Sequence, residues 1–199
     1  MIKFEKVSFE QYWKGYVDAK FRGDEDLSIE TDRAEAFRQW QGIKLPKRAT
    51  TGSAGYDFYA PYGFSVAEGS SGVTVPTGIR WVTDRSDIVL LCFPRSGLGF
   101  KYGSRLKNTT GVIDSDYCCS NNEGHIMVKW CADTYFYVKE GEAMMQGVIV
   151  PFVKTDDDVS DGIRNGGFGS TTKDASQKTK KILLNEEATI DAVSSAVQK

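Results

Sequence analysis

Residues 94–103, with the sequence PRSGLGFKYG, carry groups that could bind a chain of phosphates. Arg95 offers a guanidinium, Ser96 offers a hydroxyl, and glycines such as Gly97 let a ligand approach the backbone amides closely. Guanidinium groups and exposed backbone N–H groups are common anion ligands in proteins. A glycine-rich turn with solvated basic side chains is the alternative, which this spacing alone does not exclude.

The segment GVIDSDY, residues 111–117, brings two carboxylates to the end of an apolar run. Asp114 and Asp116 would point to opposite faces if the strand continued, so only one of them could easily face a given pocket. An aspartate at the edge of a buried strand could act as a general base for a water molecule. The alternative is an Asp-rich turn that closes a hairpin.

The segment RNGGFGSTT, residues 164–172, combines a cation, an aromatic ring and hydroxyl groups on a glycine-rich stretch. Phe168 has little to pack against in such a stretch, and an exposed ring of this kind can stack on a nucleobase. Arg164, Ser170 and Thr171 could then contact phosphates, as in a flap that closes over a nucleotide. A disordered linker is the alternative.

A β-rich body must position these groups. From residue 46 to about residue 151 the chain consists of short runs rich in Val, Ile, Tyr and Phe that are separated by turns. This pattern of short apolar runs and turns predicts a sandwich or barrel-like fold rather than alternating βαβ units. Gln146 interrupts the last of these runs, where its amide could bind a phosphate or satisfy a backbone group.

The spacing of apolar residues predicts helices at residues 8–21, 32–41 and 182–197. Ser8 and Gln11 resemble a capping box for the first helix. Asp32 is placed as the N-cap of the second helix, and Gly42 as its C-terminal stop. We expect both N-terminal helices to pack on the outside of the β body. The glycine-dense residues 162–169 have little to bury and indicate a mobile arm.

Composition narrows the classes of function. The chain of 199 residues has 25 basic and 27 acidic side chains, so its net charge of −2 gives no positive field for binding polymeric nucleic acid. No apolar stretch has the length of a signal peptide core or a membrane span, which predicts a cytoplasmic protein without membrane contact. The four cysteines lack zinc-site spacing and are expected to be reduced thiols, while the single histidine, His125, is expected to be structural.

Taken in order, five segments resemble the motifs of the trimeric dUTP diphosphatases, or dUTPases. They are TGSAGYDFYA (51–60), PRSGLGFKYG (94–103), GVIDSDY (111–117), GEAMMQGVIVPF (141–152) and RNGGFGSTT (164–172). The resemblance covers about residues 43 to 172. Two further stretches, NNEGHI (121–126) and DGIRNGGFGST (161–171), are similar to the branch of this family found in some bacteria and their phages.

The resemblance implies an all-β fold, with a jelly-roll-like β-sandwich or barrel protomer, and a homotrimer whose sites are shared between subunits. The implied reaction is hydrolysis of dUTP to dUMP and pyrophosphate with Mg²⁺. The implied organisation is an N-terminal helical extension (1–42), a dUTPase-like β domain (43–155), a flexible C-terminal arm with the fifth motif (156–172), and a tail (173–199).

The resemblance also implies residue roles. Asp114 would deprotonate the water that attacks the α-phosphorus, with Arg95 supporting it. Tyr117 would pack under the deoxyribose and exclude a ribose, and Asn108 would read the uracil edge. Asp57 would belong to the water shell of the metal ion or brace the phosphate site. The remaining implied contacts are to phosphates for Ser96, Gly97, Gln146, Arg164, Ser170 and Thr171, and to the uracil ring for Phe168.

Two other functions remain open. The related dCTP deaminases place a glutamate on the strand after the third motif, but residues 124–130, GHIMVKW, contain no acid. A nucleotide-gated protein that binds a partner such as a repressor is the second alternative. Asp114 argues against an inactive protein, although not against a dual role. The extensions, residues 1–42 and 173–199, are longer than in minimal members of the family and could bind a protein partner.

Overall fold

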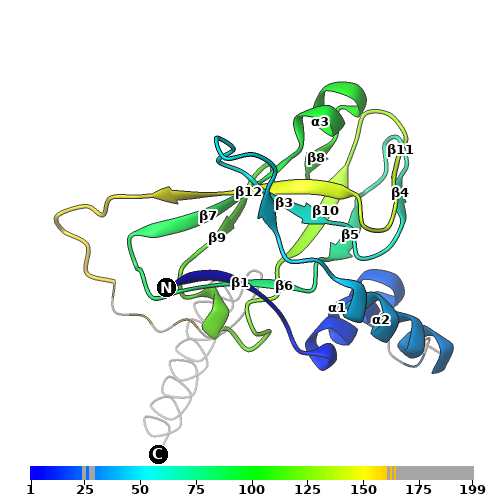
Figure 1. The fold of residues 1–199 in the computed structure, drawn as a ribbon, viewed down its shortest axis with the longest axis horizontal. Coiled ribbons are helices and arrows are strands. Elements are labelled where there is room, and N and C mark those ends of the chain that lie inside the picture. Colours follow the sequence, from blue (N-terminus) through cyan, green and yellow to red (C-terminus); the bar gives the residue numbers. More distant parts are fainter. Residues whose placement is uncertain (24–25, 27–29, 161, 163, 165–199) are drawn as a thin grey trace, which may run out of the picture. The chain divides into compact units, whose positions relative to one another are not determined.

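Antiparallel β-strands form the body of the computed structural model, which describes residues 1–23, 26, 30–160, 162 and 164 (Figure 1). These residues belong to one unit, Met1–Arg164. The strands are β1 (Ile2–Lys6), β2 (Lys47–Arg48), β3 (Tyr56–Tyr59), β4 (Phe64–Val66), β5 (Val73–Pro76), β6 (Ile79–Thr83), β7 (Ile88–Pro94), β8 (Arg105–Leu106), β9 (Gly111–Ile113), β10 (Met127–Cys131), β11 (Phe136–Val138) and β12 (Ala143–Pro151). The helices are α1 (Phe9–Phe21), α2 (Glu30–Gly42), α3 (Ser96–Tyr102) and a 3-10 turn, η2 (Tyr117–Cys119).

The largest sheet has five strands in the order β2-β3-β12-β7-β9, with β12 at its centre. The register places Gln146 of β12 opposite Asp57 of β3 on one side and opposite Phe93 of β7 on the other. A three-stranded sheet, β5-β10-β8, and two strand pairs, β1-β6 and β4-β11, complete the body. The β-rich body predicted between residues 46 and 151 is therefore confirmed.

Alternating burial along β7 shows how one strand divides core from surface. Ile88, Leu90 and Cys92 are buried, whereas Val89 and Leu91 between them are only partly buried. Successive side chains of a strand point to opposite faces, so the first set packs inward. The strands and their connections add large side chains to the same core: Phe58, Trp81, Ile126, Trp130, Phe136, Met144 and Met145.

Helix α1 is part of this core. Tyr12 and Tyr16 lie one helical turn apart, are almost completely buried, and belong to the same buried cluster as the strand residues. The predicted N-cap is present, because the Ser8 hydroxyl accepts a hydrogen bond from the Gln11 amide at 3.2 Å. The helix packs against the β body beside β5, as expected, and its buried aromatic side chains extend the core of the strands.

Other elements differ from the sequence prediction at identifiable points. Helix α2 begins at Glu30, so Asp32 lies in its first turn and is not the N-cap. A carboxylate at this position interacts favourably with the positive end of the helix dipole. Strand β1 pairs with β6 although its residues, IKFEK, are mostly charged. Helix α3 forms in the glycine-rich second motif and ends at Gly103, whose φ of 58° favours glycine.

Figure 1 shows α1 and α2 beside one another at one edge of the strands, with α3 apart from them. Within the part of the chain that the structure describes, no helix is both long and apolar enough to cross a bilayer.

The four cysteines are free thiols, as expected. The expected arm has described residues only at 156–160, 162 and 164, and the predicted helix at 182–197 lies outside the described residues.

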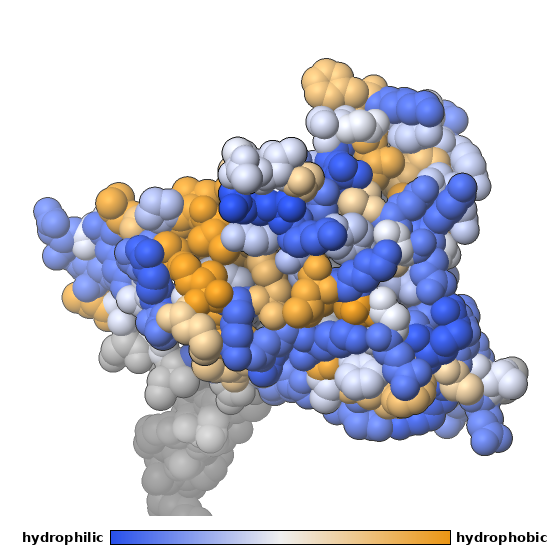
Figure 2. Space-filling view, viewed as in Figure 1, coloured by the Kyte–Doolittle hydropathy of each residue, from blue (hydrophilic) through white to orange (hydrophobic). Residues whose placement is uncertain are grey.

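The outward side of β7, β9 and β12 is apolar. Cross-strand pairing places Val148 opposite Leu91, Val150 opposite Val89, and Leu91 opposite Val112, so these five side chains share a face. Val112 is 59% exposed, and the other four side chains are partly buried. Figure 2 shows apolar surface over the region where Figure 1 places β7 and β12. We call these five residues the β7–β12 face.

Candidate functional site

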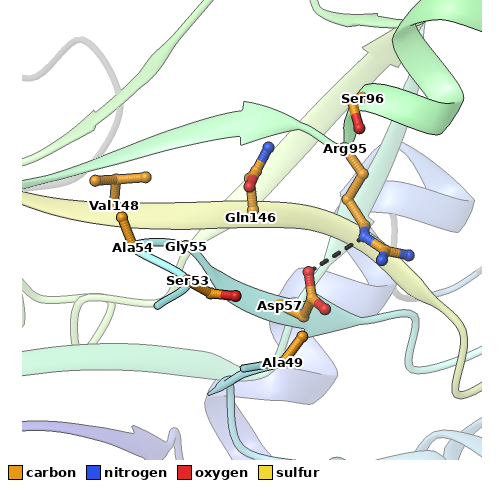
Figure 3. A pocket seen from close by; sticks show the side chains of 9 residues that line it. All are labelled: Ala49, Ser53, Ala54, Gly55, Asp57, Arg95, Ser96, Gln146 and Val148. Carbon is orange, nitrogen blue, oxygen red and sulfur yellow. Dashed lines mark ion pairs between the residues drawn. The ribbon is translucent and has the colours of Figure 1, made fainter. Parts of the chain in front are cut away.

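A pocket of about 380 Å³ lies where β3, β12 and the β7–α3 junction meet (Figure 3). Its lining brings together residues of the first, second and fourth motifs, which are far apart in the sequence. The lining residues are Ala49, Ser53, Ala54, Gly55, Asp57, Arg95, Ser96, Gln146 and Val148. Four of the side chains predicted to act on a substrate or metal therefore face one cavity: Asp57, Arg95, Ser96 and Gln146.

Asp57 and Arg95 form an ion pair in this pocket. Arg95 Nε lies 3.2 Å from Asp57 Oδ1, and the Asp57 side chain is 16% exposed against 45% for Arg95. Arg95 Nη1 also donates to the Ala143 carbonyl oxygen at 3.4 Å. Because the contacts to Asp57 and Ala143 hold the guanidinium at one side, the exposed part of the group remains accessible to an anion from the pocket (Figure 3).

Gln146 is held between two strands. Its Nε2 donates to the Pro94 carbonyl oxygen at 3.1 Å, which ties β12 to the end of β7 just before the second motif. A Cβ atom on Gly55 would lie 2.6 Å from Gln146 Oε1, so the glycine leaves the space that this amide occupies. Gly55 thus allows the first and fourth motifs to approach closely. The sequence left the role of Gln146 open, and the structure shows it bonded to a backbone group.

Gly97 lines a neighbouring cavity of about 520 Å³ that shares Arg95 and Ser96 with the first pocket. A Cβ atom on Gly97 would meet nothing within 4 Å. The backbone at this point is therefore open to a ligand. The predicted phosphate-binding segment thus borders both cavities.

The third motif meets the first residue of the fifth motif. Arg164 donates from Nε to Asp116 Oδ1 at 2.7 Å and also forms an ion pair with Asp114. Its guanidinium carbon lies 5.6 Å from the centre of the Tyr117 ring. The expectation that only one of the two carboxylates faces a given site is wrong here. Strand β9 ends at Ile113, and the chain then turns into η2, which brings both carboxylates to the same cation.

The Tyr117 side chain is nearly buried, with 7% of the residue exposed. Its hydroxyl donates to the His125 carbonyl oxygen at 3.2 Å and accepts from Asn122 Nδ2 at 2.9 Å. Burial raises the pKa of Tyr117, so the hydroxyl keeps its proton at neutral pH. The sequence did not predict Asn122 as a partner. A buried tyrosine hydroxyl requires a hydrogen-bond partner. The position of Asn122 in the turn that follows the third motif is the feature of the sequence that could have identified it as that partner.

Asp114, Tyr117 and Asn108 do not line either of these two cavities. Asn108 is exposed in the turn between β8 and β9, where its carbonyl oxygen accepts from the Thr110 amide. Phe168, Ser170 and Thr171 lie outside the described residues. Within residues 1–164, the structure therefore gathers the predicted site residues into two groups, the Asp57–Arg95 pocket and the cluster of Asp114, Asp116, Tyr117 and Arg164.

The described residues contain no group of three or more His, Cys, Asp or Glu side chains that could hold a metal ion. This donor set fits Mg²⁺ bound mainly by substrate phosphates and water, because Mg²⁺ commonly uses only one or two protein carboxylates. It does not fit an ion caged by the protein alone. Asp57, Asp114 and Asp116 are the carboxylates of the two groups.

Comparison with known proteins gives a consistent result. The family model described as dUTPase matches residues 41–172. The chain is 39% identical over 135 residues to a deoxyuridine 5′-triphosphate nucleotidohydrolase of Lactococcus lactis, covering 65% of this chain and 89% of that protein. It is 40% identical over 137 residues to the nucleotidohydrolase of the same name from Hahella chejuensis, covering 65% and 87%.

The fold is similar to two solved structures. The crystal structure of a dUTPase from Streptococcus mutans has a TM-score of 0.53 at 32% identity, covering 77% of this chain and 98% of that chain. A mutant dUTPase of phage phi11 of S. aureus has a TM-score of 0.50 at 17% identity, covering 61% of this chain and 92% of that chain. At this low identity the similarity supports the fold alone.

These similarities confirm the predicted all-β, jelly-roll-like fold class. The matched range, residues 41–172, includes all five motifs and both groups of site residues. The enzyme class predicted from the motifs, dUTP diphosphatase, is confirmed with the family. The motifs, their arrangement in space and the family match agree, so the chain belongs to the dUTPase family.

Proposed function

We propose that this protein hydrolyses dUTP to dUMP and pyrophosphate, by attack of a water molecule on the α-phosphorus. The observation that carries the proposal is the pocket that gathers Asp57, Arg95, Ser96 and Gln146 from three separated motifs. A triphosphate needs positive and hydrogen-bonding donors around its oxygens and a positioned base for water. The described residues supply both kinds of group. We expect the reaction in the cytoplasm.

Asp114 is the proposed general base. Its side chain is about half exposed, at 48%, so a water molecule can reach its carboxylate. In the structure the carboxylate is paired with Arg164, and in the reaction it accepts the proton of the attacking water. Arg95 supports the reacting phosphate from the pocket, where Asp57 fixes the orientation of its guanidinium.

The triphosphate is held by groups of the second, fourth and fifth motifs. Ser96 lines both cavities and Gly97 lines the second. In the proposal the Ser96 hydroxyl and the Gly97 amide donate to phosphate oxygens, and Gln146 adds its amide. Arg164 exchanges its carboxylate partners for the β- and γ-phosphates when the nucleotide binds. Ser170 and Thr171 of the fifth motif complete this clamp in the proposal.

The nucleoside is recognised by three further residues. Tyr117 packs under the deoxyribose, and its fixed ring leaves no room for a 2′-hydroxyl. Asn108 reads the uracil edge, and Phe168 stacks on the base. The near burial of Tyr117 and its two hydrogen bonds support a rigid role for this ring.

Mg²⁺ is the proposed cofactor. The ion would be held mainly by the phosphates, with Asp57 contacting its water shell, and when bound it would neutralise charge that develops on the phosphate oxygens. The scarcity of carboxylate clusters in the described residues is compatible with this mode of binding.

The proposed assembly is a homotrimer with sites shared between subunits. The β7–β12 face supports it, because five neighbouring apolar side chains on an open sheet face are typical of a surface that another chain covers. Val148 belongs both to this face and to the lining of the Asp57–Arg95 pocket. A chain that covered the face would therefore border the pocket and could add residues to it.

The test is release of pyrophosphate from dUTP in the presence of Mg²⁺, with dCTP, dTTP and UTP as competing candidates. We expect hydrolysis of dUTP alone, and abolition of the reaction by a chelator of divalent cations. Release of ammonia from dCTP would instead identify a deaminase. Binding of dUTP without hydrolysis would identify a nucleotide-gated binding protein.

A further inference from the structure

The turn of residues 120–125 fixes the orientation of the Tyr117 ring. Asn122 Nδ2 donates to the tyrosine hydroxyl at 2.9 Å, and the hydroxyl donates to the His125 carbonyl oxygen at 3.2 Å. Both partners of this nearly buried side chain therefore come from one short segment. A displacement of this segment would displace the ring, because within the described residues its hydroxyl makes no other hydrogen bond.

The turn is itself tightly constrained. Glu123 and Gly124 have φ values of 57° and 73°, in the left-handed region. A Cβ atom on Gly124 would lie 2.6 Å from Cys118 Cα, so the turn packs directly on the backbone that follows Tyr117. Asn122 Oδ1 accepts from the Gly124 amide at 3.1 Å, which joins the tyrosine partner to the shape of the turn.

Helix α1 holds this turn from the other side. The Glu123 carboxylate accepts hydrogen bonds from the Ser8 amide at 2.8 Å and from the Ser8 hydroxyl at 2.5 Å, at the start of the helix. Nε2 of the buried His125 ring accepts a hydrogen bond from the Gly78 amide at 2.9 Å. A Cβ atom on Gly15 would lie 2.7 Å from His125 Cε1, so this ring packs against the helix without spare room.

We propose that helix α1 and the turn of residues 120–125 form a brace that positions Tyr117, and that this brace sets the discrimination between deoxyribose and ribose nucleotides. The inference rests on the proposed function and assigns the N-terminal segment a part in it. Asn122, Glu123, Ser8 and Gly15 are positioning residues, since none of them needs to touch the substrate. A ring that excludes a hydroxyl must be held to within a fraction of an ångström, because a small shift opens the space.

The direct test is Asn122→Ala, assayed as the ratio of kcat/KM for dUTP to kcat/KM for UTP. Loss of one neutral hydrogen bond corresponds to about a tenfold effect. We expect the ratio to fall by about tenfold, with a larger change in KM than in kcat for dUTP. The removed side chain also bonds to Gly124, so circular dichroism must show that the variant remains folded.

The remote test uses two glycine substitutions in the N-terminal helices. Gly15→Ala pushes on the His125 ring, whereas Gly42→Ala in α2 adds a Cβ that meets nothing within 4 Å. We expect Gly15→Ala to lower the dUTP to UTP ratio and Gly42→Ala to leave it unchanged. Glu123→Ala should also lower the ratio, and Glu123→Gln, which keeps an acceptor for Ser8, should restore most of it.

The outcomes separate the inference from the proposed function. A wild-type protein that prefers dUTP, together with folded Asn122→Ala and Glu123→Ala variants of unchanged ratio, would overturn the brace and leave the proposed function intact. A wild-type protein that hydrolyses neither nucleotide would overturn both. Should Gly15→Ala fail to fold, the Asn122 and Glu123 variants decide the question.

Discussion

Arg164 contacts the third-motif groups that a bound nucleotide is proposed to use. It pairs with Asp114 and Asp116, and its guanidinium lies 5.6 Å from the centre of the Tyr117 ring. Two carboxylates this near to one another repel, and the shared guanidinium offsets that repulsion. A triphosphate offers the same cation a denser negative charge, so binding of the substrate can release Asp114 for its role as a base.

The first prediction separates Asp114 from Asp116. Asp114→Asn keeps the shape of the side chain but cannot accept the proton of water, so turnover of dUTP should fall by about 10²–10⁴-fold. Binding of dUTP, measured by calorimetry, should be retained. Asp116→Asn is the matched control, because it also loses a contact to Arg164 and is not the proposed base. Equal losses in the two variants would contradict the assignment.

The second prediction concerns the space beside Gln146. Gly55→Ala places a methyl group 2.6 Å from the present position of Gln146 Oε1, so the amide must move and its bond to the Pro94 carbonyl oxygen must weaken. We expect KM for dUTP to rise by about tenfold, which corresponds to one lost hydrogen bond. Gly52→Ala, whose added Cβ meets nothing within 4 Å, should leave KM unchanged.

At the scale of elements, the junction between α1 and the β body contains a buried histidine that must stay neutral. The His125 ring is fully buried, and its Nε2 accepts a hydrogen bond from the Gly78 amide. This nitrogen therefore carries no proton. Burial lowers the pKa of His125 to about 4, and the Glu123 carboxylate opposes this shift only in part. Protonation would break the bond to Gly78 and place a charge in the core.

The third prediction is that acid destabilises this junction. Between pH 6.5 and pH 4 the unfolded chain binds a proton at His125 that the folded chain does not, so the free energy of unfolding falls as the pH falls, and the loss is complete only below pH 4. From pH 7.5 to pH 5 the loss from this group is about 2 kcal/mol. His125→Gln, which keeps an acceptor for Gly78, should be less sensitive to pH in urea unfolding at fixed protein concentration. An identical pH dependence would contradict the prediction.

Elements with strong local signals could be predicted from the sequence. The Ser8 cap and the spacing of Tyr12 and Tyr16 predicted α1, and continuous apolar runs predicted β7 and β12. Strand β1 alternates apolar and polar residues over only four positions, from Ile2 to Glu5, which is a short signal. Its pairing with β6 bridges more than seventy residues, so local patterns do not predict it. Helix α3 was not predictable either, because glycine has a low intrinsic helix propensity.

The same limit applies to the candidate site. The motifs identified Asp57, Arg95 and Gln146 individually, since each stands out by chemical type. Their meeting in one pocket depends on β12 lying between β3 and β7, which is long-range pairing that local patterns do not encode. The turn of residues 120–125 was recognisable as a turn, but its contacts to Tyr117 and Ser8 depend on the tertiary fold.

At the scale of the whole molecule, the β7–β12 face connects the proposed assembly with the proposed activity. Apolar side chains that remain on an open sheet face favour association, because covering apolar surface contributes about 25 cal/mol per Å². Val148 stands at the boundary between this face and the pocket, so a partner chain on the face would also close one side of the proposed phosphate site. An isolated protomer is therefore expected to be a poor enzyme even when it is folded.

The fourth prediction tests this link with a single charge. Val112 is 59% exposed in the protomer, so Val112→Asp should leave its fold intact, but burying an unpaired carboxylate in an interface is strongly unfavourable. We expect light scattering to show a trimer for the wild type and a monomer for the variant, with loss of dUTP hydrolysis. Tyr135→Asp is the control, since Tyr135 is 60% exposed and lies outside the β7–β12 face. A trimeric, active Val112→Asp variant would show that subunits associate through another surface, and a monomeric wild type with full activity would show that one chain completes the site.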